Sequence, residues 1–70
     1  MNMEMEIELN GAPHPIAENQ NVQELIASLD LSNKSLAVAI NREVVPRHMW
    51  TQRVLKAKDR VDIVRAIGGG

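Results

Sequence analysis

The chemistry open to this chain is limited by the side chains it lacks and is concentrated at its last residues. The sequence has no cysteine, which excludes disulfides, thiolate metal sites and cysteine nucleophiles together. It ends in three consecutive glycines, Gly68, Gly69 and Gly70. Glycine costs the most backbone entropy to order and adds no side chain to packing, so these residues do not serve stability. The functional group that remains is the α-carboxylate of Gly70, on a flexible tether thin enough to thread a narrow tunnel.

This carboxylate needs activation before it can react. An α-carboxyl group has a pKa of about 3.3–3.7, so it is ionised and a poor electrophile at neutral pH. Joining it to AMP gives a mixed anhydride that a sulfur nucleophile can open, leaving a thiocarboxylate. In a chain without a thiol, the terminus is the only place for sulfur in a readily transferable covalent form. A passive, frayed end or a cloning scar is the alternative interpretation.

The other titratable side chains form no catalytic or metal-binding pattern. His14 and His48 are far apart in the sequence and lack cysteine or carboxylate ligands at zinc-like spacing, so no metal site is expected. Glu4, Glu6 and Glu8 alternate with apolar residues, as on the solvated face of a strand, and nothing apolar beside them would raise a carboxyl pKa for acid–base work.

Four residues are candidate partner contacts. Trp50 is either an interface anchor or a cover for the core. Arg47 and Arg65 would meet an acidic partner surface or remain solvated. Ile67 precedes the glycines and could add a small apolar contact.

Length and composition predict one small cytoplasmic domain. The chain has 70 residues, 44% of them apolar, with one tryptophan and no phenylalanine or tyrosine, so the core must be aliphatic. No apolar run approaches the roughly 20 residues that span a bilayer. The acidic start lacks the apolar segment of a signal peptide.

Charge is distributed unevenly along the chain. Residues 1–33 hold six acidic side chains and no lysine or arginine, whereas residues 34–70 hold all eight basic side chains and three acidic ones. Such asymmetry can indicate nucleic-acid binding. The basic residues are spread singly, without aromatic residues between them, so a nucleic-acid-binding module is kept only as an alternative.

The first half of the sequence predicts a hairpin and a helix. Residues 3–9 alternate with period two, and Asn10-Gly11 favours a two-residue turn into a return strand over 12–17. Two prolines limit that return strand to pairing on one side. Asn21 then caps a helix over 22–30, with glutamate three residues later and an apolar stripe every third or fourth residue.

The second half predicts short strands. Residues 36–41 form an apolar strand, residues 41–43 turn the chain, and Val44-Val45 begins another strand that Pro46 ends. The last strand begins at Val61, and Val64 on its polar side indicates some cover on that face. Between these strands we expect one helical turn over 47–50, an ambiguous stretch over 51–55 and a polar connection over 56–60.

A hairpin, one helix and further strands predict an α+β fold. The simplest compact arrangement is a mixed sheet of four to five strands with the helix across one face, the outline of a ubiquitin-like β-grasp. We expect a single domain over residues 1–66 and a flexible tail over 67–70.

The sequence resembles the ThiS family, the small sulfur-carrier proteins of thiamine biosynthesis. The resemblance covers essentially the whole chain, including the Asn10-Gly11 hairpin and the helix that contains Val22-Gln23-Glu24-Leu25-Ile26. Two further stretches carry it: Ala37-Val38-Ala39-Ile40-Asn41, which leads into Val44-Val45-Pro46-Arg47, and Asp59-Arg60-Val61-Asp62-Ile63-Val64, which leads into the glycines. The chain departs from the family by a short methionine-rich extension and by three glycines where two are the minimum.

The resemblance implies a carrier without a catalytic site or bound cofactor of its own. Gly70 would be adenylylated with ATP by an E1-like adenylyltransferase (ThiF type). A cysteine desulfurase relay would supply sulfur, and thiazole synthase (ThiG type) would use the thiocarboxylate. The free chain is expected to be a monomer. The nearest rivals are a sulfur carrier of the molybdopterin-synthase small-subunit type, usually longer and richer in phenylalanine, and a ubiquitin-like modifier of lysines.

Overall fold

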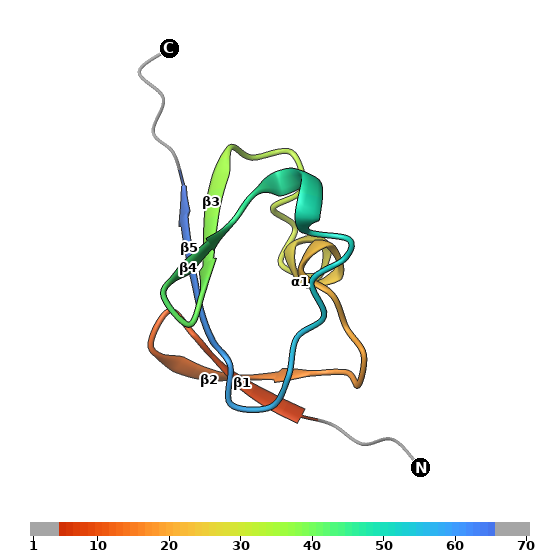
Figure 1. Ribbon diagram of the computed structural model, residues 1–70, viewed down its shortest axis with the longest axis vertical. Coiled ribbons are helices and arrows are strands. Elements are labelled where there is room, and N and C mark those ends of the chain that lie inside the picture. The colour runs from red at the N-terminus through yellow and green to blue at the C-terminus, as the bar shows by residue number, and fades with distance from the viewer. Residues whose placement is uncertain (1–4, 66–70) are drawn as a thin grey trace.

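The computed structural model describes residues 5–65, which form one five-stranded sheet and one α-helix (Figure 1). In chain order the elements are β1 (Met5–Leu9), β2 (Ala12–Ile16), α1 (Val22–Ser28), β3 (Leu36–Ile40), β4 (Glu43–Val45), a 3₁₀ turn η1 (Arg47–Met49) and β5 (Arg60–Arg65). This confirms the predicted α+β fold with a mixed sheet and one helix. No helix in this part of the chain is long and apolar enough to cross a membrane.

The last strand lies at the centre of the sheet. The strand order is β2-β1-β5-β3-β4, so β5 separates the first hairpin from the second. β5 runs parallel to β1 and antiparallel to β3, and both hairpins are antiparallel. The end of the chain is therefore carried by a strand with neighbours on both sides.

The first hairpin has the predicted turn. Asn10 and Gly11 have φ angles of 50° and 85°, and a two-residue turn of type I′ requires positive φ at both positions. Leu9 pairs with Ala12 directly across this turn. β2 pairs only with β1 and lies at an edge of the sheet, which tolerates its two prolines.

The capping box at Asn21 starts α1. The Asn21 side chain accepts a hydrogen bond from the Glu24 amide at 2.8 Å, and the Glu24 carboxylate accepts one from the Asn21 amide at 2.9 Å. The helix ends at Ser28 with Leu29 as its C-cap, slightly before the predicted residue 30. Its buried face is formed by Val22, Leu25 and Ile26.

The stretch 51–55, ambiguous from its sequence, packs against the start of α1. The Val22 amide donates to the Arg53 carbonyl at 3.0 Å, and the Leu55 amide donates to the Gln20 carbonyl at 2.8 Å. These contacts supply partners for backbone groups near a helix N-terminus, which the helix itself leaves unpaired. The stretch is thus ordered by tertiary hydrogen bonds rather than by a repeating local pattern.

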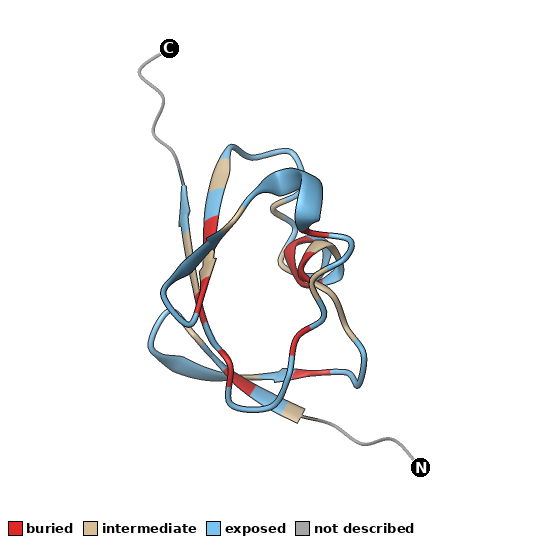
Figure 2. Cartoon of the chain, in the orientation of Figure 1, coloured by how far each residue is buried: buried red, intermediate tan, exposed pale blue. Residues whose placement is uncertain are grey.

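One face of the sheet carries the core (Figure 2). The buried hydrophobic side chains are aliphatic except for one indole: Ile7, Ile16, Val22, Leu25, Ile26, Val38, Ile40, Trp50, Leu55 and Val61. The opposite face lies away from α1. The expected cover over Val64 was wrong, because 62% of this residue is exposed.

The predicted polar connection over 56–60 also needs correction. Arg60 is the first residue of β5, and Asp59 is 7% exposed. The sequence pattern indicated a polar, charged connection and gave no sign that Asp59 is buried. Its burial depends on partners that lie elsewhere in the chain.

Candidate functional site

β5 is the strand that leads into the terminal residues that the sequence singles out. It ends at Arg65, while Ile67, Gly68, Gly69 and Gly70 lie outside the described residues, as does the predicted boundary near residue 66. Gly70 is the fifth residue after Arg65, which gives a reach of at most about 18 Å when the chain is fully extended. Any group that reacts with the Gly70 carboxylate must therefore come close to the end of β5.

The turn asparagines of both hairpins hold β5. The Asn10 side-chain oxygen accepts a hydrogen bond from the Ile63 amide at 2.8 Å, where β1 has already ended. The Asn41 side-chain oxygen accepts one from the Arg60 amide at 3.0 Å. The backbone amides of the two asparagines donate to β5 carbonyls as well, at 2.9 Å for Asn10 and 2.8 Å for Asn41.

Asp59 connects the second turn asparagine to the loop before β5. Its carboxylate accepts hydrogen bonds from the Asn41 side-chain amide at 3.1 Å and from the Lys56 backbone amide at 2.9 Å. The Arg53 guanidinium lies 3.8 Å away. A buried carboxylate is stable only when it is paired and hydrogen-bonded, so these contacts explain how Asp59 can lie inside the fold.

The structure places three of the four candidate partner contacts. Trp50 is 1% exposed and donates through Nε1 to the Val45 carbonyl at 3.0 Å. Of the two alternatives for this residue, a cover for the core is therefore confirmed and an interface anchor is wrong. Arg47 stacks over the Trp50 ring at 4.8 Å and donates to the Lys34 carbonyl at 3.0 Å, so it already has an intramolecular role. Arg65 is exposed at the end of β5, opposite Leu36 of β3.

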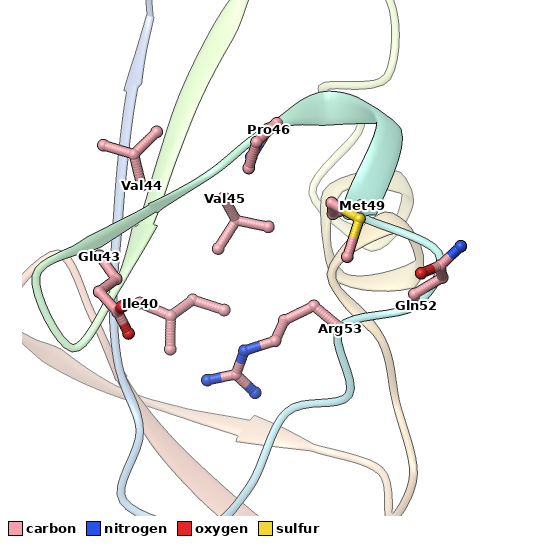
Figure 3. A pocket seen from close by; sticks show the side chains of 8 residues that line it. All are labelled: Ile40, Glu43, Val44, Val45, Pro46, Met49, Gln52 and Arg53. Carbon is pink, nitrogen blue, oxygen red and sulfur yellow. The ribbon is translucent and has the colours of Figure 1, made fainter.

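A pocket of about 250 Å³ lies between β4 and the segment that follows η1 (Figure 3). Ile40, Val45, Pro46 and Met49 supply its apolar lining, and Arg53 projects into it. The other lining residues are Glu43, Val44 and Gln52. The Arg53 guanidinium already donates to the Val54 carbonyl at 2.5 Å. The pocket contains neither a nucleophile beside a base nor a pair of convergent carboxylates.

No metal centre is formed within residues 5–65, where no cluster of three or more histidine, aspartate or glutamate side chains could hold an ion. His14 lies on β2 and His48 on η1, in different parts of the fold. Glu6 and Glu8 are exposed on β1, consistent with a solvated strand face.

Sequence reasoning missed Asn41 and Asp59, which hold β5, and Val44, which is 75% exposed on β4. A signal existed for Asn41, because asparagine tolerates positive φ and often begins a turn. Asp59 gave no such signal, since its burial depends on contacts from residues 53 and 41.

Comparison with known proteins gives consistent matches over nearly the whole chain. A sequence model of the ThiS family matches residues 7–70. The sulfur carrier protein ThiS of Escherichia coli (strain K12) is 35% identical over 66 residues, which cover 94% of this chain and 100% of that relative. A crystal structure of the thiamine biosynthesis protein ThiS from Geobacter metallireducens, 32% identical, superposes with a TM-score of 0.82 over 94% of this chain and 100% of that one.

A further relative differs in length. A thiazole synthase of Magnetococcus marinus is 35% identical over 66 residues, which are 94% of this chain and only 20% of that protein. A segment similar to this chain thus forms a small part of that longer polypeptide.

Proposed function

The chain belongs to the ThiS family of sulfur carriers in thiamine biosynthesis, and we propose that it carries the sulfur as a thiocarboxylate on Gly70. The observation that supports this most is the pairing of a cysteine-free chain with a family match that continues to its last residue. The protein acts as a co-substrate for other enzymes. The family match favours this assignment over the molybdopterin-synthase type of carrier and over a nucleic-acid-binding module.

The proposed chemistry has three steps. The Gly70 carboxylate attacks the α-phosphorus of ATP in an E1-like adenylyltransferase, forming an acyl-adenylate and releasing pyrophosphate. A persulfide sulfur from a cysteine desulfurase relay then displaces AMP and forms an acyl disulfide. Two thiols, which are oxidised together to a disulfide, supply the two electrons that reduce the acyl disulfide, and this frees the carrier thiocarboxylate and returns the relay cysteine as a thiol.

The proposed acceptor is thiazole synthase, in the cytoplasm where ATP is available. The support is the thiazole synthase of Magnetococcus marinus, which contains a segment 35% identical to this chain. A carrier-like segment and a thiazole synthase in one polypeptide are consistent with two parts that act on the same sulfur. The three glycines suit entry into the acceptor, because without Cβ atoms they pass through a narrow channel.

The test is detection of the thiocarboxylate itself. The protein is incubated with ATP, the adenylyltransferase and a sulfur source, then treated with a thiol alkylator and analysed by mass spectrometry of the C-terminal peptide. Alkylation also identifies the thiocarboxylate in the intact chain, where exchange of oxygen for sulfur and oxidation of one of the four methionines change the mass almost equally. Since the chain has no cysteine, the alkylated peptide reports a thiocarboxylate.

We expect the tag on the peptide that ends in Gly70 and no tag when ATP is omitted. A variant lacking Gly69 and Gly70 is the matched control and should remain folded but unlabelled. Absence of the tag from the intact chain, with an adenylyltransferase shown to be active on another carrier, would refute the proposal.

A further inference from the structure

The first turn holds the two groups from which an asparagine side chain can cyclise. Asn10 and Gly11 are both exposed, in the turn between β1 and β2. In this cyclisation the backbone nitrogen of the following residue attacks the side-chain carbonyl carbon, and glycine hinders that attack least because it has no Cβ. The Gly11 amide makes no backbone hydrogen bond within residues 5–65, so its nitrogen is accessible to base from the solvent.

The Asn10 side chain is held through its oxygen alone. Its Oδ1 atom accepts the hydrogen bond from the Ile63 amide at 2.8 Å, which directs the side-chain carbonyl toward β5. Ring closure therefore requires this bond to open. A single neutral hydrogen bond has a small net free energy, so local opening at an exposed turn is frequent. The Nδ2 group, which leaves as ammonia in this reaction, is not part of that bond.

The second turn has the same backbone form but protects its asparagine twice. Asn41 has a φ of 52°, close to the 50° of Asn10. Its Oδ1 atom accepts from the Arg60 amide at 3.0 Å, and its Nδ2 group donates to the buried Asp59 carboxylate at 3.1 Å. The residue that follows it is Arg42, whose Cβ hinders attack by the backbone nitrogen.

We propose that Asn10 is a site of spontaneous deamidation and that its isoaspartate product frees β5 from the first turn. The deprotonated Gly11 nitrogen forms a bond to the Asn10 side-chain carbonyl carbon. The bond from that carbon to Nδ2 breaks, and ammonia leaves with a proton from the solvent. Water then opens the five-membered succinimide at one carbonyl to give aspartate or at the other to give isoaspartate, and the reaction needs no oxidant, reductant or cofactor.

The two products differ in what they do to the turn. Aspartate keeps the main chain unchanged and retains an oxygen that accepts from the Ile63 amide. Isoaspartate carries the main chain through the former side chain, which adds a methylene group to a two-residue turn between Leu9 and Ala12. The bonds of residue 10 to Ile63 and to the Val61 carbonyl then lose their geometry. The strand that leads into the terminal residues is thereby loosened, whatever chemistry those residues perform.

The experiment follows deamidation of the folded full-length chain at mildly alkaline pH. Digestion after glutamate gives a peptide of residues 9–18, whose one asparagine is Asn10. Mass spectrometry detects the exchange of the amide NH₂ for OH, and chromatography separates the isoaspartate peptide from the aspartate peptide. Asn10 should react at least about tenfold faster than any other asparagine in the chain. Gly11→Ala should slow it by at least about tenfold although it weakens the turn, because the added Cβ hinders the attack.

The matched variant is Arg42→Gly, which places glycine after Asn41 as well. In the folded variant Asn41 should react about fivefold more slowly than Asn10, because one further hydrogen bond of ordinary strength must open. In concentrated urea the two asparagines should react at similar rates. Circular dichroism verifies that the variant is folded under the conditions of the rate measurement.

The consequence for β5 is measured on the separated products. Anion exchange isolates the deamidated chains, and Asn10→Asp provides the pure aspartate product as a reference. The isoaspartate chain should unfold at a lower urea concentration than Asn10→Asp, which should unfold close to the unmodified chain.

Three outcomes would overturn the proposal. The first is a peptide of residues 9–18 that gains no isoaspartate while other asparagines react. The second is equal rates for Asn10 and Asn41 in folded Arg42→Gly, because the hydrogen bonds to β5 and Asp59 would then have no effect. The third is an isoaspartate chain with the same urea midpoint as Asn10→Asp. None of these outcomes depends on whether Gly70 carries sulfur, so the proposed function is tested separately.

Discussion

Both hairpins reverse the chain through a two-residue turn, but they use different residues to do so. In both, two residues of positive φ join the strands: Asn10 and Gly11 at 50° and 85°, Asn41 and Arg42 at 52° and 73°. In both, the asparagine side chain accepts a β5 amide hydrogen. The first turn uses glycine at its second position, as such turns favour, whereas the second holds an arginine in the left-handed region.

The difference shows which interactions stabilise each turn. The Asn10 side chain makes one hydrogen bond, to the Ile63 amide. The Asn41 side chain makes two, because its amide group also donates to the buried Asp59 carboxylate at 3.1 Å. The second turn thus depends on a tertiary network that offsets the strained Arg42 backbone, whereas the first depends mainly on local conformational preference.

The largest effect should follow removal of the carboxylate on which the second turn depends. Asp59→Ala should lower the free energy of unfolding by about 3 kcal/mol, because it removes charge-assisted bonds to Asn41 and to the Lys56 amide. Urea denaturation measures this. Asp62→Ala, which removes a partly exposed ion pair, is the control and should cost less than about 1 kcal/mol. Equal losses in the two variants would contradict the network.

Removal of the Asn41 side chain should lower the free energy of unfolding more than removal of the Asn10 side chain. Asn41→Ala should cost about 2 kcal/mol and Asn10→Ala about 1 kcal/mol, since both lose a bond to β5 but only the first also removes a hydrogen bond to the buried Asp59 carboxylate. A double-mutant cycle of Asn41→Ala with Asp59→Ala should show a coupling energy of about 1 kcal/mol. A greater loss in the free energy of unfolding for Asn10→Ala would contradict this expectation.

Substitution of Gly11 tests how far the first turn depends on the conformational preference of its own residues. A Cβ added there would meet no atom within 4 Å, so Gly11→Ala is penalised by backbone strain alone at φ +85°. The expected loss is about 1 kcal/mol in the free energy of unfolding. An unchanged urea midpoint would show that the turn tolerates a side chain as the second turn does.

The smallest expected effect is a gain in the free energy of unfolding. Arg42→Gly relieves the left-handed strain but increases the entropy of the unfolded chain, which leaves a net stabilisation of about 0.5 kcal/mol. Arg42→Ala is the control, because it removes the side chain and keeps the strain, and it should leave stability nearly unchanged. A loss in Arg42→Gly would indicate that the Arg42 side chain itself stabilises the turn.

The sequence by itself determined those features that depend on neighbouring residues. Asn10-Gly11 predicts a type I′ turn because both residues tolerate positive φ, and Asn21 with Glu24 predicts a capping box three residues apart. The apolar stripe of α1 follows from the helical period in the same way. The glycine-rich end also identified the group with the proposed chemistry without any structure.

Only the tertiary structure decided which side chains are covered. Asp59 lies between Lys58 and Arg60 and is buried, whereas Val64 follows the apolar Ile63 in β5 and is exposed. Val64 and Val44 are distant in the sequence and share one face only because β3 lies between their strands. Local patterns record the conformational preferences of adjacent residues, but burial depends on which distant elements pack against them, and that is settled by the topology of the whole sheet.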